Sequence, residues 1–205
     1  KTATAVKYSA YAKGIGWLSA ADGKTAGTSG QARILESLQM KIANGEGTGS
    51  IVYNTYVQST GWTGEKKDGA SSGTQGSGKR IEAVKIHLTG EMASYYDVYY
   101  RTYCQSFGWL GWAKNDQTAG TIDYGKRVEA VQVKLVRKGA AAPGSTANTY
   151  KQAEIKYRTH VQTYGWKDYS YDGETSGTTG KAKRLEAIQI RFPDAKMNQY
   201  IQYKT

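Results

Sequence analysis

The segment IVYNTYVQSTGW, residues 51–62, is the most informative about the fold, because the chain repeats it with variations. The other copies are VKYSAYAKGIGW from Val6, VYYRTYCQSFGW from Val98 and IKYRTHVQTYGW from Ile155. Every copy ends on a Gly-Trp pair, and the tryptophans of these pairs are Trp17, Trp62, Trp109 and Trp166. Recurrence of one pattern at nearly regular intervals indicates a tandem-repeat architecture.

A second set of features follows each Gly-Trp pair. A Gly-Thr pair comes first, beginning at Gly27, Gly73, Gly120 and Gly177, and an apolar segment closes each repeat: ILESLQMKI, RIEAVKIHL, RVEAVQVKL and RLEAIQIRF. The 25 glycines, 17 tyrosines and only 2 prolines suit strands joined by tight turns. We therefore predict an all-β fold of four tandem antiparallel β-sheet repeats around a pseudo-symmetric axis, either β-prism-like or propeller-like.

The interval before the last repeat is longer, because it contains RKGAAAPGSTAN, residues 137–148, whose composition is typical of a loop or linker. We predict a three-repeat β domain over residues 1–136, with repeats at about 6–42, 51–88 and 98–135, and a linker or long loop at 137–154. Residues 155–205 would hold the fourth repeat and the start of a fifth, since IQYKT at the far end matches IKYRT. A single four-repeat body is the alternative.

The first strand of each repeat has two distinct faces, because side chains alternate along a strand. One face is apolar and is predicted to be core, and Cys104 falls on it as a small buried residue. The opposite face is polar yet repeatedly aromatic, with Tyr11, Tyr56, Tyr103 and His160 at one position and Gln58, Gln105 and Gln162 at the next. This face is the first candidate for a ligand-binding surface, and aromatic pairing across strands against a neighbouring repeat is the structural alternative.

The five tryptophans divide into two groups. A tryptophan at one fixed position per repeat suits a repeated core, so Trp17, Trp62, Trp109 and Trp166 are second-tier candidates, more structural than ligand-binding. Trp112 has no counterpart in the other repeats, so we expect it to be exposed in a loop and count it with the ligand-binding candidates.

A carboxylate is predicted to face inward at the start of each closing strand. Glu36, Glu82, Glu129 and Glu186 hold this position. A buried carboxylate must be paired or hydrogen-bonded, so we predict that it latches its strand to a Gly-Thr turn.

Composition argues against several function classes. The net charge of +11 favours anionic partners, but Lys and Arg are spread through every repeat, which argues against nucleic acid. The chain has one cysteine and only two histidines, His87 and His160, so we predict no enzyme, no catalytic residue, no metal site and no cofactor. The lone aspartates of the Asp-Gly turns support calcium only weakly. No apolar run is long enough to predict membrane insertion.

The assembled pattern, YxxYVQxxGW, then DG, then GTxG, then RxEAxxI, resembles the clostridial hydrophobic repeat with its signature tryptophan, the ChW repeat. The resemblance implies an extracellular protein, secreted or cell-wall associated. It implies a non-catalytic module that binds carbohydrate or an anionic wall polymer, with a protein-interaction or adhesion module for a host or partner protein as the alternative. It carries over no catalytic residues.

Overall fold

The computed structural model describes residues 5–193, so the predicted start of a fifth repeat at Ile201–Thr205 lies outside the described residues. The chain divides into two compact units, Lys1–Lys151, here called the body, and Gln152–Thr205, which contains the fourth repeat. Each unit is described by itself.

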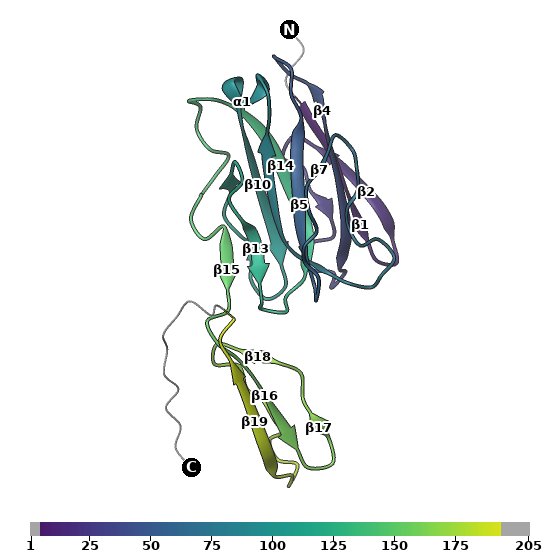
Figure 1. Cartoon of the computed structure of the whole chain (residues 1–205), viewed down its shortest axis with the longest axis vertical. Coiled ribbons are helices and arrows are strands. Elements are labelled where there is room, and N and C mark those ends of the chain that lie inside the picture. Colours follow the sequence, from purple (N-terminus) through teal and green to yellow (C-terminus); the bar gives the residue numbers. More distant parts are fainter. Residues whose placement is uncertain (1–4, 194–205) are drawn as a thin grey trace. The chain divides into compact units, whose positions relative to one another are not determined.

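The body contains three repeats, each built on two long antiparallel strands (Figure 1). The first repeat comprises β1 (Ala5–Ala12), β2 (Gly16–Ala21), β3 (Ala26–Gly27) and β4 (Leu35–Asn44). The second comprises β5 (Ile51–Val57), β6 (Gly61–Trp62), β7 (Lys66–Lys67), β8 (Ser72–Gly73) and β9 (Ile81–Leu88). After the short helix α1 (Met92–Tyr95), the third comprises β10 (Tyr96–Cys104), β11 (Gly108–Trp109), β12 (Ala113–Lys114), β13 (Ala119–Ile122) and β14 (Val128–Arg137), and β15 (Tyr150–Gln152) follows. The all-β prediction is confirmed.

The fourth repeat has the same order of strands. It comprises β16 (Lys156–Val161), β17 (Gly165–Trp166), β18 (Ser170–Tyr171) and β19 (Leu185–Arg191). β16 pairs with β19 along one edge and with β17 and β18 along the other.

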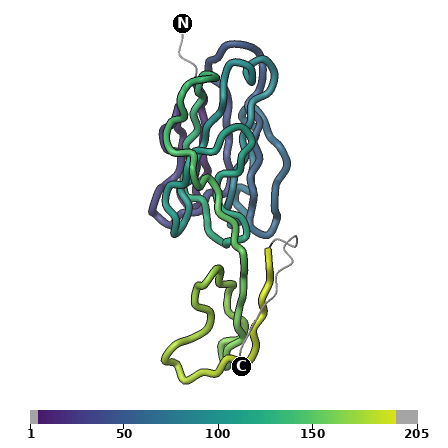
Figure 2. The backbone as a smooth tube through the Cα atoms, turned by 90° about the vertical axis from the view of Figure 1, so that its left-hand side faces the viewer, coloured from purple at the N-terminus to yellow at the C-terminus, as the bar shows by residue number. Residues whose placement is uncertain are grey.

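The three repeats of the body are linked in a cycle by their short Gly-Thr strands. β8 of the second repeat pairs with β4 of the first, β13 of the third pairs with β9 of the second, and β3 of the first pairs with β14 of the third. Each repeat therefore completes the sheet of another. The long strands run side by side through the body, as the backbone tracing also shows (Figures 1 and 2).

The inward faces of the three sheets share one hydrophobic core. The predicted core face of the first strands is buried in all three repeats of the body, at residues Val6, Tyr8, Ala10, Ala12, Ile51, Tyr53, Thr55, Val57, Val98, Tyr100, Thr102 and Cys104. Burial raises the pKa of the Cys104 thiol to about 12, which keeps it protonated and unreactive at neutral pH.

An inward tyrosine recurs in every repeat: its ring is buried in the core in the three repeats of the body and half-buried in the fourth, and its hydroxyl reaches a turn. The hydroxyl donates a hydrogen bond to a backbone carbonyl just after the Asp-Gly or equivalent turn. The pairs are Tyr8 with Lys24, Tyr53 with Ala70, Tyr100 with Gln117 and Tyr157 with Glu174.

The predicted carboxylate latch to a Gly-Thr turn is present for Glu36 and Glu129, and in both cases the turn belongs to another repeat. For Glu186 the prediction of an inward carboxylate is wrong, because this residue is exposed and contacts His160. Glu36 is 1% exposed and accepts hydrogen bonds from the backbone N–H groups of Gly76 and Gly78 in the second repeat, at 2.7 and 2.9 Å. Glu129 accepts one from Gly30 of the first repeat, at 2.8 Å. The latch therefore joins the first repeat to the second and the third to the first, which are two of the three links that the exchanged strands define.

Candidate ligand-binding face

The face of each sheet that points away from the core, here called the outer face, carries one aromatic pair per repeat. The predicted residues Tyr11, Tyr56, Tyr103 and His160 lie directly across the strand pairing from Trp17, Trp62, Trp109 and Trp166. The two rings of each pair meet edge to face, with ring centroids 5.4–5.6 Å apart. Each repeat thus presents an equivalent aromatic platform on its outer face.

These four tryptophans do not belong to the hydrophobic core, so the expectation of a repeated tryptophan core is wrong. Trp17, Trp62 and Trp109 are half-buried on the outer face, and Trp166 is 46% exposed. The reason is the strand register: the tryptophan pairs with an outward tyrosine, and paired residues project from the same face.

The predicted glutamines lie just beyond the ends of the first long strands and not in the centre of the outer face. The backbone N–H groups of Gln58, Gln105 and Gln162 donate to carbonyls of Arg80, Arg127 and Arg184. The Gln105 side chain accepts a hydrogen bond from Arg127 Nη1 at 2.9 Å. All three are half-buried and follow the outward Tyr or His of their repeat by two residues.

Trp112 is 5% exposed, so the expectation of an exposed loop tryptophan is wrong. The segment after β14 folds back over it: Trp112 N–H donates to the Ser145 carbonyl at 2.8 Å, and Gly111 N–H donates to the Asn148 carbonyl. The predicted linker is therefore, in part, the cover of this tryptophan.

Trp112 also has a counterpart, which the sequence comparison missed. Ala113 and Ser170 occupy equivalent places opposite Tyr100 and Tyr157, so the residue before each, Trp112 and Tyr169, holds the same position. The regular distance to the following turn could have revealed this equivalence.

In the third and fourth repeats this position forms a stack with an arginine. The Arg101 guanidinium lies 4.7 Å from the centre of the Trp109 ring and 4.8 Å from that of Trp112. Arg158 lies 4.8 Å from Trp166 and 4.9 Å from Tyr169. Burial lowers the pKa of Arg101.

The second repeat has a smaller set at the same place. Lys85 Nζ lies 5.2 Å from the centre of the Trp62 ring, and Asn54 and the exposed Glu65 replace the arginine and its second aromatic partner. Tyr56 is bordered by a loop of the third repeat: its pKa is raised, first by burial and then by the nearby carboxylates of Asp123 and Glu82.

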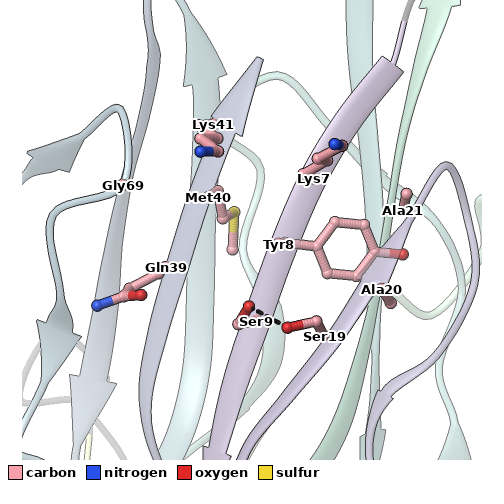
Figure 3. Close-up of a pocket in the computed structure, with 10 residues that line it drawn as sticks. All are labelled: Lys7, Tyr8, Ser9, Ser19, Ala20, Ala21, Gln39, Met40, Lys41 and Gly69. Atoms are coloured by element: carbon pink, nitrogen blue, oxygen red, sulfur yellow. Dashed lines mark hydrogen bonds between the residues drawn. The ribbon is translucent and has the colours of Figure 1, made fainter. Parts of the chain in front are cut away.

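In the first repeat the arginine and the second ring are both replaced by serine, and the outer face is hollow. Ser9 and Ser19 are hydrogen-bonded to each other at 2.9 Å on the floor of an open cavity of about 500 Å³ (Figure 3). Lys7, Gln39 and Lys41 stand around it. Two residues along β1, the Tyr11–Trp17 pair continues the same face.

Over residues 5–193, no three His, Cys, Asp or Glu side chains gather in a way that could hold a metal ion. The same residues include no helix that is both long and apolar enough to cross a membrane.

Fold and outer face together define a tandem-repeat, all-β module whose repeats carry equivalent aromatic platforms. Comparison with protein families matches the model described as Clostridial hydrophobic W to residues 11–44, 56–90, 103–137 and 160–194, and the chain belongs to this ChW family. The predicted resemblance is confirmed, and each matched segment begins at the outward Tyr or His of its repeat. Comparisons with curated proteins and with solved structures gave no match.

Proposed function

We propose that this protein is a non-catalytic module that binds carbohydrate through its outer faces, with the hollow of the first repeat as the principal site. The observation that carries the proposal is the change from an arginine sandwiched by two rings in the third repeat to an open cavity beside Tyr11 and Trp17 in the first. Its volume lies within the range of small-ligand sites, about 300–1,000 Å³.

The chemistry around the hollow suits a sugar. The hydroxyls of Ser9 and Ser19 and the amide of Gln39 offer both donors and acceptors, as a ring of sugar hydroxyls requires. The half-buried ring of Trp17 offers an apolar surface for the C–H side of a pyranose.

Two lysines at the hollow favour acidic sugars or an anionic wall polymer. Lys7 and Lys41 are exposed on either side of the floor, and the whole chain carries a net charge of +11. Together with the family, this supports an extracellular, wall-associated location as part of the proposal.

The proposal is tested by placing a larger side chain in the cavity of the first repeat. Ser19→Trp places in the first repeat the residue type that Trp112 provides in the third, and Ser19 is exposed, so the fold should tolerate it. We expect the affinity for glycans that bind the unmodified chain, identified on a glycan array and measured by calorimetry, to fall at least about tenfold, a loss of about 1.4 kcal/mol.

The matched control is Glu65→Trp, which adds the same ring at the equivalent position of the second repeat. It should leave the affinity within about twofold of the original, a difference of about 0.4 kcal/mol. Equal loss of affinity in both variants would contradict the assignment to the first repeat, and an array without any bound glycan would contradict carbohydrate binding itself.

A protein-binding role is the second candidate. The specific observation that favours it is the apolar inward face of the fourth repeat, where Leu185 is 56% and Ile188 is 55% exposed.

A further inference from the structure

The fourth repeat has the strands of a complete repeat, but apolar residues on its inward face are exposed, whereas their equivalents in the other three repeats are buried. Leu185 and Ile188 are more than half exposed, whereas their equivalents in the first repeat, Leu35 and Leu38, are 0% and 1% exposed. The equivalents in the second and third repeats, Ile81, Val84, Val128 and Val131, are also buried, at 0–1%.

Within residues 5–193, β19 and Glu186 of the fourth repeat do not show the contacts with another repeat that their equivalents make in the body. β14, which precedes it, already pairs with β3, and within residues 5–193 β19 pairs only with β16. Glu186 contacts His160 at 2.9 Å, where Glu36 of the first repeat holds the turn of a neighbouring repeat. The side chain of Glu186 is 38% exposed, in contrast to its buried equivalents.

The Gly-Thr segment of the fourth repeat has the same local contact and backbone conformation as the Gly-Thr segment of the second repeat, which pairs with a strand of a neighbouring repeat. Ser176 is hydrogen-bonded to Thr159 at 3.1 Å, as Ser72 is to Thr55 at 3.1 Å. Gly177 has φ +121°, the same value as Gly73. A side chain on Gly73 would come within 2.3 Å of the Glu36 carbonyl of the neighbouring repeat, whereas one on Gly177 would meet nothing closer than 3.6 Å.

We propose that the fourth repeats of three copies of this chain assemble into the same three-repeat arrangement as the body, and so form a trimer. Each copy would lay Ser176–Gly177 against β19 of the next copy, opposite Ile188 and Ala187, as Ser72–Gly73 lies opposite Leu38 and Ser37. The turn that follows would supply backbone N–H groups to Glu186.

Three is the number that closes this arrangement. In the body every repeat gives its short strand to one neighbour and receives one from another, and the cycle ends after three repeats. Because that contact is heterologous, identical units obeying it close into a ring with three-fold symmetry. The exposed apolar residues would then be buried, which supplies the driving force.

Sedimentation velocity on the full 205-residue chain over a wide range of concentrations tests the proposal. We expect the unmodified chain to convert from monomer to trimer as the concentration rises. Ile188→Glu should remain monomeric, and so should Gly177→Val, whose side chain would meet the neighbouring backbone as one at Gly73 would. Ile188 is exposed, so Ile188→Glu should fold, whereas Gly177→Val also strains a backbone with φ +121°. Circular dichroism therefore checks that each variant is folded, and Ile188→Glu tests assembly without backbone strain.

The matched control is Gln189→Glu, which adds the same charge to β19 as Ile188→Glu but on its outer face. It should assemble like the unmodified chain. An unmodified chain that stays monomeric or stops at a dimer, or a Gly177→Val variant that still forms trimers, would overturn the proposal.

Disulfide trapping tests the register separately. Chains carrying only Ser176→Cys are mixed with chains carrying only Ile188→Cys, and Cys104 does not interfere because it is buried. Oxidation should link the two kinds of chain in preference to like chains. Absence of this preference would contradict strand exchange. Assembly is read as mass and cross-links, so its failure is distinguishable from a failure of glycan binding.

Discussion

At the scale of single residues, the inward glutamate connects local sequence to the arrangement of the repeats. Arg80 and Arg127 lie 2.7–2.8 Å from Glu82 and Glu129, but the first repeat has Ile34 at that position. The contacts described for the Glu36 carboxylate are therefore the backbone N–H groups of the second repeat. A buried carboxylate without those donors would be strongly unfavourable.

We expect Glu36→Ala to destabilise the body by about 2–4 kcal/mol, because it removes two charge-assisted hydrogen bonds and leaves two N–H groups without their acceptor. The change in the free energy of unfolding is measured by chemical denaturation, with tryptophan fluorescence as the signal. Glu65→Ala, at an exposed position, is the control and should change stability by less than about 0.5 kcal/mol. Similar effects of both substitutions would refute the latch.

At the scale of elements, the sorting of the long strands into two faces could be predicted, because alternation over six to ten residues depends only on backbone geometry. Tyr53 and Tyr56 illustrate this: the first is buried and the second faces outward. The exchange of Ala26–Gly27, Ser72–Gly73 and Ala119–Gly120 could not be predicted in the same way. Strands of two to four residues are too short to show a period, and their partners lie in another repeat.

Within the candidate site too, features set by local sequence could be predicted better than features set by contacts between distant residues, as Trp112 and the Gly-Trp tryptophans show. The sequence predicts, as the alternative to a ligand-binding face, that the outward tyrosines pair with a neighbouring repeat, whereas their aromatic partner is the tryptophan of the same repeat. The burial of Trp112 depends on Ser145 and Asn148, in a segment whose composition indicates only a loop. Burial of a residue by a segment distant in the sequence cannot be predicted from the local sequence pattern.

Each short strand that pairs with another repeat contains a glycine, and substitution of Gly73 tests whether glycine is required there. A Cβ there would lie 2.3 Å from the Glu36 carbonyl oxygen, so we expect Gly73→Ala to cost at least about 3 kcal/mol of stability. Gly69→Ala is the control, because Gly69 also has positive φ (+94°) but has no atom within 4 Å of its Cβ position. It should show only the backbone cost, about 1–2 kcal/mol. Thermal unfolding compares the two, and equal losses would mean that the close approach is unimportant.

At the scale of the whole molecule, the charge of +11 separates two kinds of ligand. The attraction of an anionic wall polymer should weaken as salt rises from about 0.1 M to about 1 M, because the screening length falls from about 10 Å to about 3 Å. A neutral glycan held in the hollow of the first repeat should bind almost equally at both. Calorimetry at the two salt concentrations distinguishes them, and salt-independent binding of the polymer would contradict an electrostatic contribution.

The cyclic link between the first and third repeats also constrains how the protein is made. Ala26 pairs with Val131, so the first repeat cannot reach its final form until the third has left the ribosome. Until then the nascent chain holds two repeats with open apolar faces, and contacts between such distant residues form slowly. The biosynthetic folding unit of the body is thus the set of three repeats, although the unit of its sequence is one.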